Sequence, residues 1–383
     1  MDNTGKKKGS LVTKALDKSF IKAFNLREKL MPGFPAWEFN LAQDDYHKNL
    51  YRANYLTIRG DRKKSVELLV RILRELPNDR RTNLNLSFLI AQDASKVLAD
   101  HAYGLISQLK VDVDTNDHFA RTLCELLLTL EDRKAKEVTD HYIENFLLKD
   151  LIKPIDKNQK PIFFWHIPKC AGTSISTYIS SQFYKHNHDF FPGSHTPLFL
   201  KLLTEEKTGL FPYISSAHFG LSVFDREAIN DNYFQIGVVR DPKSRSISSW
   251  RQYYDDPLKR LAVLQQHGSI WDYWPRASLK EWSERAPVSH SNYLVSTFSS
   301  QMDADDAFEF AKGIDYLASF KNISASIQAV CERYGLEFSK DAIPTKLNST
   351  NKSLTHSSED ELYLEEALQL DLSFYNRIEP LLK

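Results

Sequence analysis

The stretch from Pro161 to Ser174, PIFFWHIPKCAGTS, limits what this chain can fold into more than any other part of it. An uninterrupted apolar run, Ile162–Ile167, leads into a loop of small and polar residues, and Thr173–Tyr184 then has apolar side chains at helical spacing. This order predicts a buried strand, a tight loop and a helix. Such junctions bind phosphate in α/β proteins, because backbone N–H groups and the positive end of the helix dipole face the anion.

Lys169 adds a full positive charge to this loop. The pattern differs from the P-loop GxxxxGK[ST], because here the lysine precedes Gly172 instead of following a second glycine. The loop therefore predicts an anion site that differs from that of an ordinary ATPase or GTPase.

A second strand, loop and helix follow later in the chain. The apolar run Tyr233–Val239 leads into Arg240, and Pro242 then suits the first turn of a helix. One anion site can arise by chance, whereas two in one α/β domain indicate a ligand with two phosphates. Between these two units, Tyr213–Gly220 predicts a short strand that ends at His218.

The chain before residue 155 has a different character. Residues 1–43 are predicted to be a tail with an amphipathic segment, Leu11–Phe24, which we interpret as a helix packed on its own protein rather than on a membrane. Residues 44–154 predict an all-α domain. Its first unit has an apolar stripe from Val66 to Leu76 and a Pro-Asn-Asp turn, which resembles a tetratricopeptide repeat. The domain divides into three expected helix pairs, Asn49–Asp79, Arg80–Asp114 and Thr115–Asp150.

The end of the chain is predicted to be largely helical. We expect Asp303–Gly335 to be helical. The serine and glutamate of Ser358–Glu361 predict a capping box that opens a single closing helix, with an apolar stripe from Leu364 to Tyr375. Residues 155–383 therefore form one predicted α/β domain.

Composition excludes several classes of protein. Fifty Lys and Arg residues balance fifty Asp and Glu residues among 383, so no global charge points to nucleic acid. Three cysteines far apart fit neither a disulfide framework nor a zinc site. No run reaches the roughly 18 apolar residues of a membrane span. We therefore expect a soluble, cytoplasmic protein.

Three motifs resemble those of a known family. Residues 166–174, HIPKCAGTS, resemble the HIPKTGGTS-type phosphosulfate loop of carbohydrate sulfotransferases, and residues 238–250, VVRDPKSRSISSW, resemble that family's RDPxxRxxS segment, which holds a 3′-phosphate. SAHFG at 216–220 is similar to the histidine segment of the uronosyl 2-O-sulfotransferase branch. The resemblance covers about residues 160–383. It implies a P-loop-like, mostly parallel sheet flanked by helices.

The resemblance also implies an activity, the transfer of a sulfuryl group from 3′-phosphoadenosine 5′-phosphosulfate (PAPS) to a hydroxyl of a saccharide or glycoconjugate. Lys169 would stabilise the leaving phosphate, and His218 would be the general base with His195 as the reserve candidate. No metal is needed. Arg245 stays open between a structural and a donor-binding role. The expected donor-binding residues are Lys169, Cys170, Ala171, Gly172, Thr173, Ser174, Arg240, Ser248 and Lys352.

Two other functions stay open. A P-loop kinase would share the strand–loop–helix site, but it would need the GK[ST] order and a carboxylate that holds Mg²⁺. A helical-repeat adaptor would bind a protein partner through its N-terminal helices and carry an inactive, nucleotide-binding domain. The presence together of Lys169, His218, Arg240 and Ser248 favours the enzyme over the adaptor.

Overall fold

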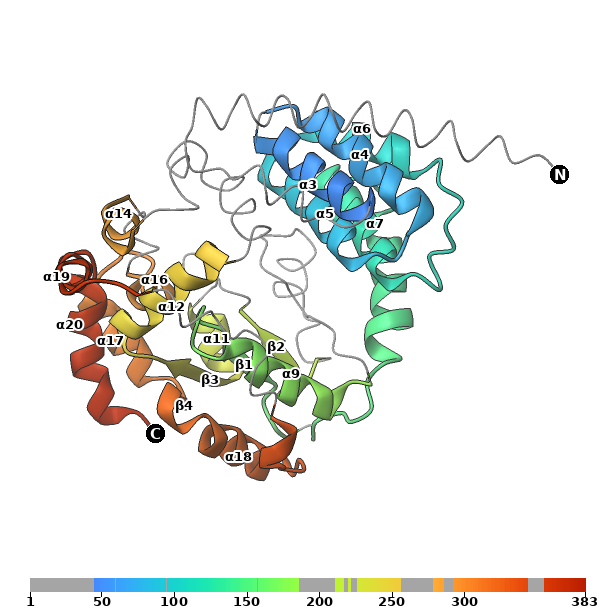
Figure 1. The fold of residues 1–383 in the computed structure, drawn as a ribbon. Helices are drawn as coiled ribbons and strands as arrows, with labels where there is room; N and C mark the ends of the chain where they lie inside the picture. The colour runs from blue at the N-terminus through green and yellow to red at the C-terminus, as the bar shows by residue number, and fades with distance from the viewer. Residues whose placement is uncertain are drawn as a thin grey trace.

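In the computed structural model, an all-α part precedes an α/β part built on a parallel sheet (Figure 1). The predictions on Leu11–Phe24, His195, His218 and Lys352 fall outside the described residues. No helix in the described part of the chain is long and apolar enough to cross a membrane. The described residues are 45–58, 60–93, 95–156, 158–185, 211–216, 220–221, 226–255, 278–285, 292–343 and 355–383.

Four parallel strands form the sheet, in the order β2-β1-β3-β4. Strands β1 and β3 are direct neighbours, and every residue of β1, β2 and β3 is buried. Buried parallel strands are expected where helices cover both faces of a sheet. The predicted parallel sheet is thus confirmed. The strands are β1 (Ile162–Trp165), β2 (Tyr213–Ser215), β3 (Phe234–Val239) and β4 (Tyr316–Ser319).

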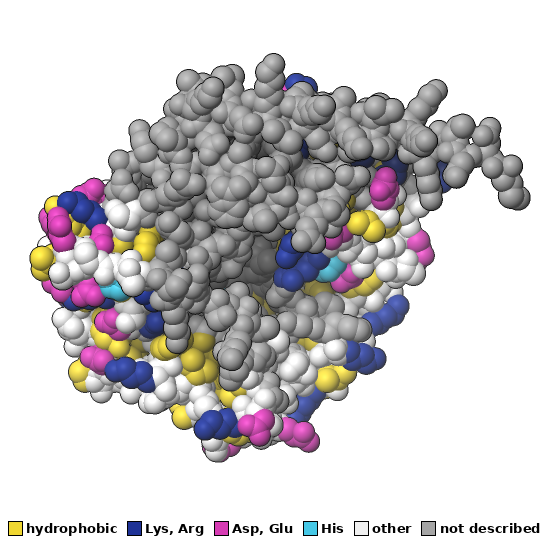
Figure 2. All heavy atoms as spheres, viewed as in Figure 1, with side chains coloured by type: hydrophobic (Ala, Val, Ile, Leu, Met, Phe, Trp, Pro, Cys, Tyr) yellow, Lys and Arg dark blue, Asp and Glu magenta, His cyan; other side chains and the backbone are white. Residues whose placement is uncertain are grey.

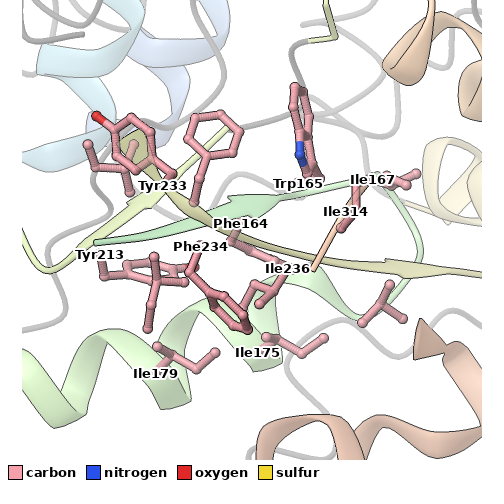
Figure 3. Close-up of a cluster of buried hydrophobic side chains, with 14 of the residues drawn as sticks. Phe164, Trp165, Ile167, Ile175, Ile179, Tyr213, Tyr233, Phe234, Ile236 and Ile314 are labelled. Carbon is pink, nitrogen blue, oxygen red and sulfur yellow. The ribbon is translucent and has the colours of Figure 1, made fainter. Parts of the chain in front are cut away.

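Helices α9 (Gly172–Phe183) and α18 (Ile323–Tyr334) pack against each other on one face of the sheet. Phe164 of β1 lines a small cavity there together with Ile175 and Ile179 of α9. Figure 3 shows these isoleucines on one side of the strands, opposite to Trp165 and Tyr233. The strand before the first loop is therefore packed directly on the helix after it.

The opposite face of the sheet carries an aromatic core. The ring of Trp165 lies edge-on to Phe298 and Phe310, with 5.9 and 5.5 Å between centroids. Phe374 packs behind Phe298 at 5.8 Å. The three helices that supply these rings are α16 (Tyr293–Phe298), α17 (Ala304–Lys312) and α20 (Gln369–Ile378).

Each of the three predicted N-terminal units contains two helices, while the tetratricopeptide arrangement itself stays a prediction. A hydrophobic core of their own extends from Leu50 to Leu126. Ala120, Cys124 and Tyr142 of the third pair belong instead to the core that includes the sheet. The helices are α3 (Asp45–Ile58), α4 (Arg62–Glu75), α5 (Arg80–Asp93), α6 (Lys96–Ile106), α7 (Asp117–Thr129) and α8 (Ala135–Tyr142), which continues as the π-helix η1 (Ile143–Leu148).

The segment that joins the two parts is held on the end of α9. Leu151 forms an isolated β-bridge with Tyr184, and the N–H of Ile152 donates to the carbonyl of Phe183 at 2.8 Å. The remaining elements are α11 (Arg226–Asn232), α12 (Pro242–Asp255), α14 (Leu279–Arg285), α19 (Ser358–Ala367), η4 (Phe320–Asn322), η5 (Lys340–Ala342) and η6 (Glu379–Leu381).

Two strand predictions are wrong. The segment Asp303–Gly335 is not helical throughout, because β4 lies within it between α17 and α18. Strand β2 ends at Ser215, because its pairing with β1 stops there, so it is shorter than predicted.

Three helix predictions also need correction. The capping box is formed by Ser357 and Asp360, one residue earlier than predicted, because this shorter acidic side chain reaches the N–H of Ser357 at 2.8 Å. The closing helix is broken at Leu368 into α19 and α20. Leu76 is half-exposed instead of buried, because α4 ends one residue before it.

Candidate active site

The loop between β1 and α9 contains two residues in the left-handed backbone region, Lys169 at φ 68° and Ala171 at φ 62°. This region costs a residue that has a Cβ about 1–2 kcal/mol. Between them, the N–H of Cys170 donates to the carbonyl of Ile167 at 3.3 Å, which folds the loop back before α9 begins at Gly172. The loop is therefore held by its surroundings and not by local backbone preference.

The first turn of α9 forms one wall of this loop. Its first intrahelical hydrogen bond runs from the N–H of Ile175 to the carbonyl of Ala171 at 3.2 Å. The N–H groups of residues 172–174 precede that bond and point out of the helix end. The half-buried hydroxyl residues Thr173 and Ser174 lie in the same turn. This is the arrangement that binds phosphate at a helix N-terminus.

The imidazole of His166 fills the space beside Gly172. A Cβ at position 172 would lie 1.9 Å from Cδ2 of His166, so only glycine leaves room for this ring. The ring stacks on Phe164 with 5.6 Å between centroids. The backbone N–H of His166 donates to Oγ of Ser216 at 3.0 Å, and Ser216 is fully buried at the end of β2. The start of the loop is thus anchored to the neighbouring strand.

Neither His166 nor Ser216 is among the predicted site residues. His166 stands inside an apolar run, where the sequence predicts only a structural role. Ser216 is one of several serines, and only strand pairing shows which backbone group it meets.

Arg240 follows β3 and reaches the first loop. Its Nη1 donates to the carbonyl of Lys169 at 3.2 Å, and its guanidinium lies 4.5 Å from the ring centroid of Phe320. Paired parallel strands end at the same edge of a sheet, where α/β proteins bind their ligands. The contact brings the two predicted phosphate loops together.

Positive charge gathers around Arg240. Burial is the main cause that lowers the pKa of its guanidinium; the charge of Asp241 acts in the opposite direction, and the charges of Arg245 and Arg251 lower the pKa further. The carboxylate of Asp241 accepts the N–H of Ser244 at 2.8 Å and caps α12. Arginine stays protonated in proteins, so Asp241 balances part of this positive charge, and a bound phosphate would stabilise the group further. On the face shown in Figure 2, basic and acidic side chains are interspersed over the described residues, so the positive charge is a local feature.

Arg245 is 1% exposed, and its Nη2 donates to Oγ of Ser246 at 3.0 Å. Asp371 of α20 is buried nearby. Burial raises the pKa of the Asp371 carboxyl to about 6, and the charge of Arg245 acts in the opposite direction. Because Arg245 is buried, a structural role is favoured over a role in binding the donor.

The thiol of Cys170 is 1% exposed. Burial raises its pKa to about 12, so it is a neutral thiol near pH 7 and not a nucleophile. The position holds a small, buried side chain. All three cysteines are buried and free.

The structure describes eight of the predicted site residues. In the structure, the loop that contains Lys169 contacts Arg240. Ser248 is half-buried on α12, about two helical turns beyond Arg240. Lys243 of α12 is paired with Glu365 of α19. No group of three or more His, Cys, Asp or Glu side chains within the described ranges could hold a metal ion. The eight residues are Lys169, Cys170, Ala171, Gly172, Thr173, Ser174, Arg240 and Ser248.

A comparison with known families shows what this part of the chain is similar to. Residues 155–308 match the Sulfotransferase family. The match starts before β1 and includes both loops, so the whole candidate site lies in a region that is similar to a sulfotransferase domain. No curated protein and no solved structure matches the chain.

The sulfotransferase match ends at residue 308, within α17. Three elements lie beyond the match. β4 completes the sheet, and α18 and α20 belong to the helices that cover its two faces. The all-α part also lies outside it.

Proposed function

We propose that this chain is a PAPS-dependent sulfotransferase that acts on a hydroxyl of a saccharide or glycoconjugate. The observation that carries the proposal is the contact between Arg240 and the carbonyl of Lys169. PAPS carries a phosphosulfate on its 5′-oxygen and a phosphate on its 3′-oxygen. Two neighbouring cationic loops, the first at a helix N-terminus, suit a donor with two anionic groups. The family match at residues 155–308 supports sulfuryl transfer in general.

In this proposal the first loop binds the 5′-phosphosulfate. Negative charge builds up on the bridging oxygen of the donor as the S–O bond breaks. Lys169 and the amides of residues 172–174 stabilise that charge more in the transition state than in the ground state. Thr173 and Ser174 add hydroxyl donors. Arg240, with Ser248 and Lys352, holds the 3′-phosphate.

His218 is the proposed general base. It takes the proton of the acceptor hydroxyl, whose oxygen attacks sulfur while adenosine 3′,5′-bisphosphate leaves. The ordinary pKa of histidine, about 6.5, suits this role near neutral pH. The similarity of SAHFG to the uronosyl 2-O-sulfotransferase branch favours His218 over His195. A protein partner on the three N-terminal helix pairs is a further proposal.

The direct test is incubation with radiolabelled PAPS and a panel of glycans, glycolipids and small hydroxyl compounds. We expect label to move to at least one saccharide acceptor. Binding of adenosine 3′,5′-bisphosphate is measured separately by calorimetry. If no acceptor is labelled and the nucleotide does not bind, the proposal is wrong. Binding without any transfer would favour the inactive adaptor instead.

Replacing Arg240 tests the second loop. We expect Arg240→Lys to weaken binding of adenosine 3′,5′-bisphosphate about tenfold and Arg240→Ala about a hundredfold. Lysine keeps the charge but cannot hold a phosphate through two N–H groups. Adenosine 5′-monophosphate, which lacks the 3′-phosphate, is the matched control ligand, and its affinity should barely change. Equal losses for both nucleotides would remove Arg240 from the 3′-phosphate site.

Replacing the two histidines separates the candidate bases. His218→Ala should lower kcat by about 100-fold or more, in the range that general-base catalysis contributes. The affinity for adenosine 3′,5′-bisphosphate should stay the same, because the donor loops are intact. His195→Ala is the matched control and should keep most of the turnover. Near-full turnover of His218→Ala would show that another group is the base.

A further inference from the structure

Phe320 lies beside Arg240 because of the register of the sheet. Strands β3 and β4 run parallel, and Val239 is paired with Ser319 at the last residue of each strand. Arg240 and Phe320 follow these two residues, so they leave the same edge of the sheet as neighbours. The guanidinium of Arg240 lies over the ring of Phe320, 4.5 Å from its centroid. An aromatic side chain therefore contacts the second predicted phosphate loop directly.

The guanidinium of Arg240 is held on two sides. Its Nη1 donates to the carbonyl of Lys169 at 3.2 Å, and its face lies on the ring of Phe320. A planar group with one edge contact and one face contact loses at least one of them when it turns. This guanidinium makes no other hydrogen bond to a described residue, so its remaining N–H groups can bind a ligand in a fixed direction.

Phe320 is itself held in place. Its half-buried ring packs against the hydrophobic core that includes the sheet. The turn that it begins, η4, is capped by Ser319, whose Oγ accepts the N–H of Lys321 at 3.3 Å. α18 continues directly from this turn at Ile323. The ring is therefore a fixed support for the guanidinium of Arg240.

We propose that Phe320 is a positioning residue that orients Arg240 toward the 3′-phosphate of the donor, and that it thereby makes the site selective for nucleotides with this phosphate. The inference rests on the proposed function, because it takes Arg240 as the residue that binds the 3′-phosphate. A cation over an aromatic face is attracted by the charge distribution of the ring. Arginine recognises phosphate best through two parallel N–H groups, so the direction of its plane matters as well as its charge. Phe320 lies beyond the residues that match the Sulfotransferase family.

Phe320→Leu tests the inference. Leucine keeps an apolar side chain against the core but has no aromatic face, so Arg240 loses its support. We expect the affinity for adenosine 3′,5′-bisphosphate to fall about fivefold, within the range of a cation–π contact, while that for adenosine 5′-monophosphate barely changes. Phe320→Tyr is the conservative variant, and it should keep the wild-type affinity because it keeps the ring. Calorimetry measures both nucleotides.

The decisive measurement is made in two backgrounds. In Arg240→Ala, the additional change Phe320→Leu should not lower the preference for adenosine 3′,5′-bisphosphate over adenosine 5′-monophosphate any further, because the side chain that it orients is already absent. A general weakening of the fold would lower both affinities in both backgrounds. Phe308→Leu in α17 is the matched control. The Phe308 ring supports Arg377 at 4.1 Å in the same way, but neither residue belongs to the candidate site, so the preference should stay at the wild-type value.

Phe320→Met provides a second variant if thermal unfolding shows that Phe320→Leu does not fold. Methionine adapts to irregular space in a core but offers no aromatic face, so we expect the same loss of preference. Equal losses for the two nucleotides, or an unchanged preference in either folded variant, would overturn the inference. An unchanged preference in Arg240→Ala itself would instead contradict the 3′-phosphate site of the proposed function, and the inference with it.

Discussion

Lys169→Ala is expected to lower kcat about 100- to 1,000-fold. Removing one preorganised donor from a transition-state oxyanion typically raises the barrier by about 3 kcal/mol, and a full cation is at least as important where phosphate charge develops. The measurement is single-turnover transfer of label from PAPS. The fold should survive, because alanine, like lysine, has a Cβ at φ 68° and adds no new backbone strain.

Lys169→Gly separates the side chain from the backbone. Glycine adopts φ 68° without a steric penalty, so this variant should lose the same turnover and yet unfold at a temperature no lower than that of Lys169→Ala. Lys169→Arg keeps the charge and should retain part of the turnover. If Lys169→Ala kept more than a tenth of the wild-type rate, Lys169 would not be the cation that stabilises the leaving group.

Gly172→Ala is expected to destroy the donor site. A Cβ there would meet the ring of His166 at 1.9 Å, far inside van der Waals contact, so either the ring or the first turn of α9 must move. Affinity for adenosine 3′,5′-bisphosphate should fall at least tenfold. Stability should fall by about 1–3 kcal/mol, as for other overpacked sites. Calorimetry and thermal unfolding measure the two effects.

The cause can be checked by restoring the space. Adding His166→Ala to Gly172→Ala removes the ring that the new methyl group meets, so nucleotide affinity should recover by most of what was lost. His166→Ala alone should have a smaller effect than Gly172→Ala, since the loop keeps its hydrogen bond from the N–H of residue 166 to Ser216. A double variant as weak as Gly172→Ala alone would mean that the glycine matters for another reason.

The elements around the first loop were predictable because their patterns are local. β1 begins at Ile162 as predicted, and α9 spans Gly172–Phe183 against a predicted Thr173–Tyr184. A continuous apolar run and a 3.6-residue period are properties of a few neighbouring residues. The second loop follows the same rule, since α12 begins at Pro242.

β4 was missed because its sequence, YLAS, has no pattern of its own. It is a strand because Ile236–Val239 of β3 offers it a partner. The break at Leu368 has a similar origin, because Leu364 and Leu368 are both fully buried and the apolar stripe continues past the break. Pairing and packing with distant residues override local preference at both places.

The amino-acid sequence specifies which chemical groups are available: a lysine in a small-residue loop at a helix start, an arginine after a second strand, and candidate histidines. Which of these groups meet depends on how the chain folds. Arg240 touches the carbonyl of Lys169 across 71 positions of the chain, because β1 and β3 are neighbours. The closeness of Gly220 to Ser296 likewise depends on how α16 packs. Periodicity reports which face of an element is buried, whereas strand order and helix packing depend on the whole chain.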